Sequence, residues 1–158
     1  MNGTQSQNDD TEVIDVGEIR AIDFQRYAIA CGDRNPIYFD DEAARKAGYP
    51  GIVAPPQYLT SVIAWEAGPL DEELAIDGVK RNRLPPELEG KRGMGGGHDL
   101  VFHRAVRPGD KVTAYRRFAG KSEKDSKLGR MTLMVWEIRY EDEHGEPIAT
   151  CRSTTIFV

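Results

Sequence analysis

Helix signals fill the first half of this chain and strand signals fill the second half, and this division constrains the fold more than any other feature. The expected helices cover 24–31, 42–47 and a segment that starts at Pro55. The expected strands cover 13–20, 100–106, 111–118, 130–140 and 147–157. One early strand, then helices, then antiparallel strands predict an α+β domain.

Capping residues mark the boundaries of the first two helices. Asp23 can cap the first helix with its carboxylate, and Gly32 can end it. Asp40 or Asp41 can cap the second helix, which Gly48 would close.

Two adjacent prolines predict the start of the third helix. Pro55 and Pro56 suit a first helical turn, where a missing N–H costs nothing. The helix should run through Leu59 and Val62 and stop near 68–69. Because it is apolar on most sides, we expect it to be buried.

The composition excludes several classes of protein. The chain has 158 residues and a net charge of −5, and its Lys and Arg are scattered, which argues against nucleic acid as a partner. No apolar run approaches the roughly 20 residues of a membrane span. No Cys or His spacing is typical of a metal site. We expect residues 1–11 to be a disordered leader and 12–158 to be one domain.

The two cysteines indicate a compartment. Cys31 and Cys151 are far apart in a chain without an apolar signal-peptide core, so reduced thiols are expected rather than a disulfide. This favours a cytoplasmic protein.

Two turns carry the most specific motif. Residues 32–40 read Gly-Asp-Arg-Asn-Pro-Ile-Tyr-Phe-Asp, and residues 51–56 read Gly-Ile-Val-Ala-Pro-Pro. The first resembles the Gly-Asp-x-Asn-Pro-Ile-His signature of MaoC-like hydratases and dehydratases, the (R)-specific enoyl-thioester hydratase superfamily. Residues 102–110, which contain Phe-His-Arg and Arg-Pro-Gly-Asp, resemble the strand and Pro-Gly-Asp turn of that family. The resemblance covers about 13–158 and implies a hot dog fold, an antiparallel sheet wrapped around a central buried helix.

The resemblance also implies a reaction and shows where this chain departs from it. Hydration of an enoyl thioester needs a base, an acid and a hydrogen-bond donor to the thioester oxygen. In the family an Asp and a His hold the water, and a backbone N–H at the start of the central helix is the donor. Asp33 matches the Asp, but Tyr38 replaces the His and Pro56 replaces the donor Gly. A phenol with a pKa of about 10 is a poor base, and proline has no N–H.

Each of these residues also has a purely structural interpretation. Asp33 can bond nearby backbone N–H groups in a good turn, and Tyr38 can be an ordinary half-buried tyrosine. The resemblance implies substrate contacts for Asn35, Pro36, Ala54, Pro55 and Pro56. Asn35 and Pro36 are also expected to shape the turn.

The remaining candidates are weaker. We expect His98 and His103 to be solvated strand residues, and Trp65 and Trp136 to be core residues. Residues 71–97 form a long connection whose glycine run, 93–97, suits close backbone approach or a flexible entrance. The basic residues of this region, which could meet coenzyme A phosphates or simply be solvated, are Arg81, Arg83, Lys91 and Arg92.

The chain as a whole resembles the N-terminal-type, FAS1-like dehydratase domain, seen in the family as one half of a double hot dog. In such pairs one half carries Asp and His, and the other half has degenerate motifs and holds the acyl chain. This implies a subunit of an (R)-specific enoyl-CoA hydratase or 3-hydroxyacyl-thioester dehydratase that takes an acyl-CoA or acyl-carrier thioester and no cofactor. Its partner would be a catalytic MaoC-like chain in a hetero-oligomer, or a second copy in a homodimer. Two alternatives stay open, a non-catalytic homodimeric acyl-thioester binder and a self-sufficient hydratase that uses Asp33 with another base.

Overall fold

The computed structural model describes residues 11–65, 70–74, 88, 90–127 and 129–158, without the side chains of 63–65. Its main element is a five-stranded antiparallel sheet in the order β1-β3-β4-β5-β2. The strands are β1 Glu12–Glu18, β2 Gly93–Phe102, β3 Lys111–Ser126, β4 Gly129–Asp142 and β5 Pro147–Phe157.

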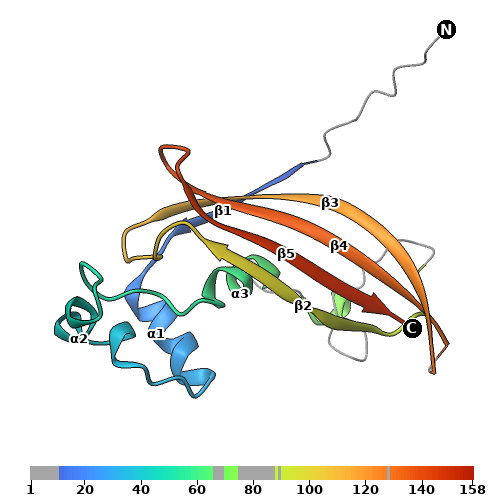
Figure 1. Ribbon diagram of the computed structural model, residues 1–158, viewed down its shortest axis with the longest axis horizontal. Coiled ribbons are helices and arrows are strands. Elements are labelled where there is room, and N and C mark those ends of the chain that lie inside the picture. The colour runs from blue at the N-terminus through green and yellow to red at the C-terminus, as the bar shows by residue number, and fades with distance from the viewer. Residues whose placement is uncertain (1–10, 66–69, 75–87, 89, 128) are drawn as a thin grey trace, which may run out of the picture.

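The described α-helices all lie on one side of this sheet, as Figure 1 shows. They are α1 Ala21–Ala30, α2 Asp41–Lys46 and α3 Tyr58–Trp65, with short 3₁₀ turns at Pro36–Tyr38 and Asp71–Glu73. The sheet curves around α3, so the fold is the hot dog that the sequence predicted. None of the described helices combines the length and the apolar character that crossing a membrane requires.

The main core lies between the sheet and the helical side. Phe24 of α1 and Leu59 of α3 are completely buried, as is Tyr140 of β4. The ring of Tyr58 meets that of Phe24 edge to face, with centroids 6.1 Å apart. Aromatic contacts therefore hold α1 and α3 together, and both helices share one core cluster with the sheet.

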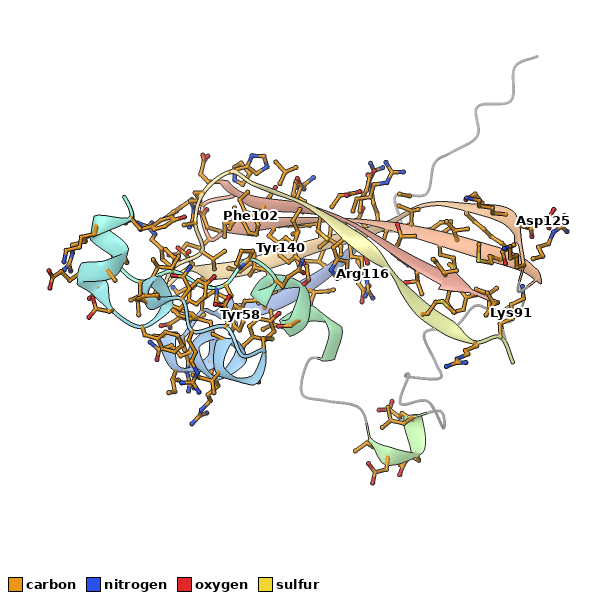
Figure 2. All side chains as sticks on the ribbon, turned by 60° about the horizontal axis from the view of Figure 1, so that its bottom comes forward. Tyr58, Lys91, Phe102, Arg116, Asp125 and Tyr140 are labelled. Carbon is orange, nitrogen blue, oxygen red and sulfur yellow. The ribbon has the colours of Figure 1, made fainter. Side chains whose placement is uncertain are left out.

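The strands extend well beyond the helices. Figure 2 shows Asp125 and Lys91 at the end of the molecule away from Tyr58 and Phe102. A second, smaller core supports this extension and consists of Leu88, Met134 and Phe157 with Trp136 packed against them. The prediction that Trp136 is a core residue is confirmed, while the side chain of Trp65 lies outside the described part.

Two strand predictions were wrong. Residues 120–126, which lie between the strands expected over 111–118 and 130–140, also belong to a strand, because β3 runs to Ser126 and pairs with β4. The side chains of 121–125 are exposed, so their charges remain solvated while the backbone ladder continues.

The glycine run also belongs to a strand, since β2 begins at Gly93 rather than at Leu100. A Cβ on Gly96 would lie 2.9 Å from Thr154 Cγ2 and 3.0 Å from the Thr154 carbonyl oxygen. The close backbone approach expected for this run is therefore confirmed at Gly96.

The helix starts differ from prediction in two of three cases. α1 begins two residues before Asp23, so Asp23 lies in its first turn and forms an ion pair with Arg20 at 3.1 Å instead of capping the helix. Asp40 does cap α2, accepting the Ala43 N–H at 2.7 Å. α3 begins at Tyr58, so the two prolines precede the helix rather than lying inside its first turn.

An arginine joins two turns at one end of the sheet. Arg104, which follows β2, donates to Asp110 Oδ2 at 2.7 Å and to Asp142 Oδ2 at 3.2 Å. Asp110 ends the Pro-Gly-Asp turn and also accepts the Arg107 N–H at 2.8 Å. The turn expected from the sequence is thus confirmed, and Arg104 links its aspartate to Asp142, which is 38 residues from the arginine.

Candidate active site

The chain leaves α1 through a glycine in the left-handed conformation. Gly32 has a φ of 72°, and its N–H donates to the Ile29 carbonyl at 3.0 Å. The next N–H, that of Asp33, donates to the Ala28 carbonyl at 2.9 Å. This double hydrogen bond is a Schellman motif, in which glycine avoids the cost of a Cβ. It ends the helix and directs the chain so that Asp33 stands exposed at the start of the following turn.

Asp33 and Tyr38 come together across that turn. Asp33 Oδ1 accepts the Asn35 N–H at 3.0 Å, and Asn35 Oδ1 accepts the Ile37 N–H at 3.3 Å. The 3₁₀ turn that begins at Pro36 then brings the Tyr38 side chain back to a hydrogen bond with the Asp33 side chain. The expected shaping of the turn by Asn35 is confirmed.

The environment of Tyr38 keeps its phenol protonated. The residue is only 5% exposed, and burial is the largest cause that raises its pKa above the ordinary value. The negative charge of Asp33 and the hydrogen bond between the two side chains raise the pKa further, while a hydrogen bond with Asn35 opposes the shift. At neutral pH Tyr38 is therefore a hydrogen-bond donor to Asp33 and is unsuited to act as a general base.

The second turn is tied to the first and to the sheet by backbone bonds. The Val53 N–H donates to the Ile37 carbonyl at 3.2 Å, and the Ala54 N–H donates to the Val106 carbonyl at 2.8 Å. Ala54 is in the same core cluster as Tyr38 and Pro55 is also buried, whereas Pro56 is exposed. The predicted site residues are thus assembled in one place, where two turns meet the start of α3.

The start of α3 offers few backbone donors. Neither Pro55 nor Pro56 has an N–H, and the Tyr58 N–H already donates to the Pro55 carbonyl at 3.0 Å. The first N–H after the prolines belongs to Gln57, one residue later than the donor glycine of the MaoC-like pattern. The position that would bind a thioester oxygen in that pattern therefore has no donor here.

A polar pair at the same place was missed by the sequence analysis. His98 of β2 lies with Nδ1 3.3 Å from Gln57 Oε1, which also accepts the Thr60 hydroxyl at 3.0 Å. His98 is exposed, as predicted for a solvated strand residue, but it has a specific partner at the start of α3. No signal in the sequence connects two residues 41 positions apart. His103 is exposed beyond the end of β2 and is not part of this site.

Of the basic residues that could meet phosphates or simply be solvated, the two that the structure describes, Lys91 and Arg92, lie away from the site. Lys91 Nζ lies 3.4 Å from Thr132 Oγ1 at the far end of the sheet, and Arg92 pairs with Val158 through backbone bonds. Arg81 and Arg83 lie outside the described residues, as does most of the connection over 71–97.

A protein-family model matches nearly the whole chain. The family model described as "FAS1-like, dehydratase domain region" matches residues 1–151. The chain belongs to this family. The family's relatives and structures agree with the resemblance that the two turns indicated.

Two relatives carry informative names. The 3-oxo-4,17-pregnadiene-20-carboxyl-CoA hydratase alpha subunit of Mycobacterium tuberculosis is 82% identical over 126 residues, which cover 72% of this chain and 38% of the relative. The probable enoyl-CoA hydratase alpha subunit of Thermomonospora curvata is 32% identical over 135 residues, covering 78% of this chain and 40% of the relative. The chain thus spans about two fifths of each of these hydratase subunits.

A solved structure supports the fold. The ChsH1-ChsH2 complex from Mycobacterium tuberculosis matches with a TM-score of 0.70 at 22% identity, covering 92% of this chain and 81% of the matched chain. At this identity the likeness establishes the hot dog fold.

Substitutions at Asp33 can separate a chemical role from a turn role. Asp33→Asn keeps an oxygen for the Asn35 N–H but removes the charge, whereas Asp33→Ala removes both. If Asp33 orients water or substrate, both variants should lower the turnover of the assembled enzyme at least about tenfold, and only Asp33→Ala should lose stability, by about 1 kcal/mol. Turnover and thermal melting are measured on the same samples. If Asp33→Asn keeps the wild-type turnover, the role of Asp33 is limited to shaping the turn.

Proposed function

We propose that this chain is the acyl-holding subunit of a heteromeric (R)-specific enoyl-CoA hydratase or 3-hydroxyacyl-thioester dehydratase. The catalytic His would come from a MaoC-like partner chain. The observation that carries the proposal is the pairing of Asp33 with a protonated Tyr38 where the family has an Asp and a His. Asp33 is proposed to orient water or substrate.

The start of α3 also supports a chain that holds the acyl group and a partner that supplies the catalytic residues. A turn that contains Pro55 and Pro56 cannot donate the backbone hydrogen bond that stabilises an enolate-like thioester oxygen. It can still form a rigid apolar wall, because Ala54 and Pro55 are buried in the core cluster or beside it. We therefore assign Asn35, Pro36, Ala54, Pro55 and Pro56 to substrate contact rather than to proton transfer.

The names of the relatives support the choice of subunit and of substrate. Both hydratase relatives are alpha subunits, a term that implies a second kind of chain. The substrate printed for the more similar relative, 3-oxo-4,17-pregnadiene-20-carboxyl-CoA, is the first candidate for this chain. The hydration itself is acid–base chemistry on a thioester, for which we propose no cofactor.

The cellular location is also a proposal. Cys31 and Cys151 are both unbridged, and burial raises the pKa of the Cys151 thiol to about 11. Thiols of this kind persist in a reducing compartment, so we propose that the protein works in the cytoplasm.

Reconstitution tests the proposed function. The chain is combined with a MaoC-like chain that carries the Asp and His motif, and loss of the enoyl-thioester absorbance is followed with 3-oxo-4,17-pregnadiene-20-carboxyl-CoA and with crotonyl-CoA. We expect the mixture to hydrate a CoA thioester at a rate that neither chain reaches alone. A tight complex with bound thioester and no turnover would instead support a non-catalytic binding protein.

A further inference from the structure

One face of the sheet is not covered by any of the described helices. Figure 1 shows α1, α2 and α3 on the opposite side. We call this bare side the outer face; its surface is formed by alternate residues of each strand, among them Tyr115, Arg139 and Thr150, which are in register. A groove of about 820 Å³ crosses it. The exposed apolar side chains on it include Val13 at 63% and Val101 at 57%.

A row of four charged residues crosses the outer face within this groove. The strand register places Arg117, Glu137, Arg152 and Asp99 side by side on β3, β4, β5 and β2. Their charges alternate, positive, negative, positive, negative. Arg117 pairs with Glu137, whereas no ion pair to Arg152 or Asp99 is found within the described residues.

An alternating row with an even number of charges can pair with a copy of itself. When the copy is turned end to end, each positive charge faces a negative one. A two-fold axis that runs parallel to the strands, between β4 and β5, reverses the row in a second copy. Arg117 then faces Asp99 of the second copy, and Glu137 faces Arg152. A two-fold axis perpendicular to the strands that ran along the row would instead place like charges opposite each other, which is unfavourable.

The same rotation also matches apolar residues. Leu133 of β4 and Ile156 of β5 lie next to each other on the outer face, so the rotation sets Leu133 of each copy against Ile156 of the other. Tyr115 of β3 meets Val101 of β2 in the same way. Two sheets packed face to face lie about 10 Å apart with nearly aligned strands, which is the distance that such side chains bridge.

We propose that the outer face binds the outer face of a second copy of this chain, back to back, about that two-fold axis. An isologous contact of this kind requires a surface that is complementary to itself, and the alternating row meets that requirement. A partner with charge of one sign would be repelled by half of the row. The contact leaves the edge strands β1 and β2 free to pair with another chain, and it does not depend on which reaction the protein takes part in.

Charge-reversing substitutions test the proposal, because each one alone should break the contact and the two together should restore it. Arg152→Glu places a carboxylate opposite Glu137 of the second copy, and Glu137→Arg places two guanidinium groups opposite each other. The double variant, Arg152→Glu with Glu137→Arg, restores opposite charges at every position. We expect each single variant to have half the mass of the wild-type protein in sedimentation velocity at micromolar concentration, and the double variant to have the wild-type mass.

The experiment uses the full chain, both alone and with a catalytic partner. Arg26→Glu is the matched control, because Arg26 is an exposed residue of α1 and that helix lies on the opposite side of the sheet. Circular dichroism and melting establish that each variant is folded. Equal masses for wild type and both single variants overturn the proposal. A double variant that stays at half mass also overturns it, because the loss would then not come from the paired charges.

Discussion

The purified chain alone is expected to hydrate crotonyl-CoA, or a longer enoyl-CoA, several orders of magnitude more slowly than an ordinary enzyme. Tyr38 is buried, hydrogen-bonded to Asp33 and raised in pKa, so it cannot replace a histidine base. Loss of a general base costs about 10²–10⁴-fold, and loss of an oxyanion donor at Pro56 costs roughly another 10²–10³-fold. A turnover of about 10 s⁻¹ or more by the single chain would refute the proposal that a partner chain supplies the catalytic groups.

Restoring the missing groups provides the complementary measurement. Tyr38→His returns an imidazole beside Asp33, and Pro55→His with Pro56→Gly returns a backbone N–H at the start of α3. Since the turn that joins Asp33 to Tyr38 is already formed, the triple variant should gain activity over the wild-type chain without a partner. Tyr38→Phe is the matched control, because it changes the same position without adding a base.

The largest loss of stability is expected from Phe24→Ala. Phe24 is completely buried and packs edge to face on Tyr58, so its removal leaves a cavity between α1 and α3. Such substitutions cost about 3–5 kcal/mol, a large part of the roughly 5–15 kcal/mol that stabilises a typical domain. The expected fall in melting temperature is on the order of 10 °C.

Ile29→Ala on the same helix is the control for this loss. Ile29 is 46% exposed, so its truncation should change the free energy of unfolding by less than about 1 kcal/mol. Equal losses in the two variants would mean that α1 is not held by the packing of Phe24. Melting of both variants is followed by circular dichroism under identical conditions.

Local chemistry made much of the site predictable. Gly32, Asp33, Asn35 and Tyr38 lie within seven residues, so their arrangement follows from one helix end and one turn. Asp40 caps α2 and the Pro-Gly-Asp turn forms for equally local reasons. The α+β class and the hot dog fold could also be predicted, because the periodicity of the apolar residues, the turn residues and the family motif agree.

The extents of the strands were harder to predict, because the sequence pattern reports which face is buried and not how far a ladder continues. Beyond the helices both faces of β3 are exposed, so the charged residues over 121–125 look like a turn although they are strand. Gly96 looks like a loop residue, but it lies in β2, where Thr154 of the neighbouring strand leaves no room for a Cβ.

The fold class follows from the order of helix and strand signals along the chain. The approach of Tyr38 to Asp33 and the absence of a backbone donor at Pro55 and Pro56 each depend on residues within one turn. In contrast, the contact of His98 with Gln57 and the alternating row of four charges from four strands arise only in the folded sheet. These contacts depend on strand register, and a shift of one residue would move every side chain to the other face. Register is fixed by packing across the whole sheet, and for that reason no local pattern in the sequence contains it.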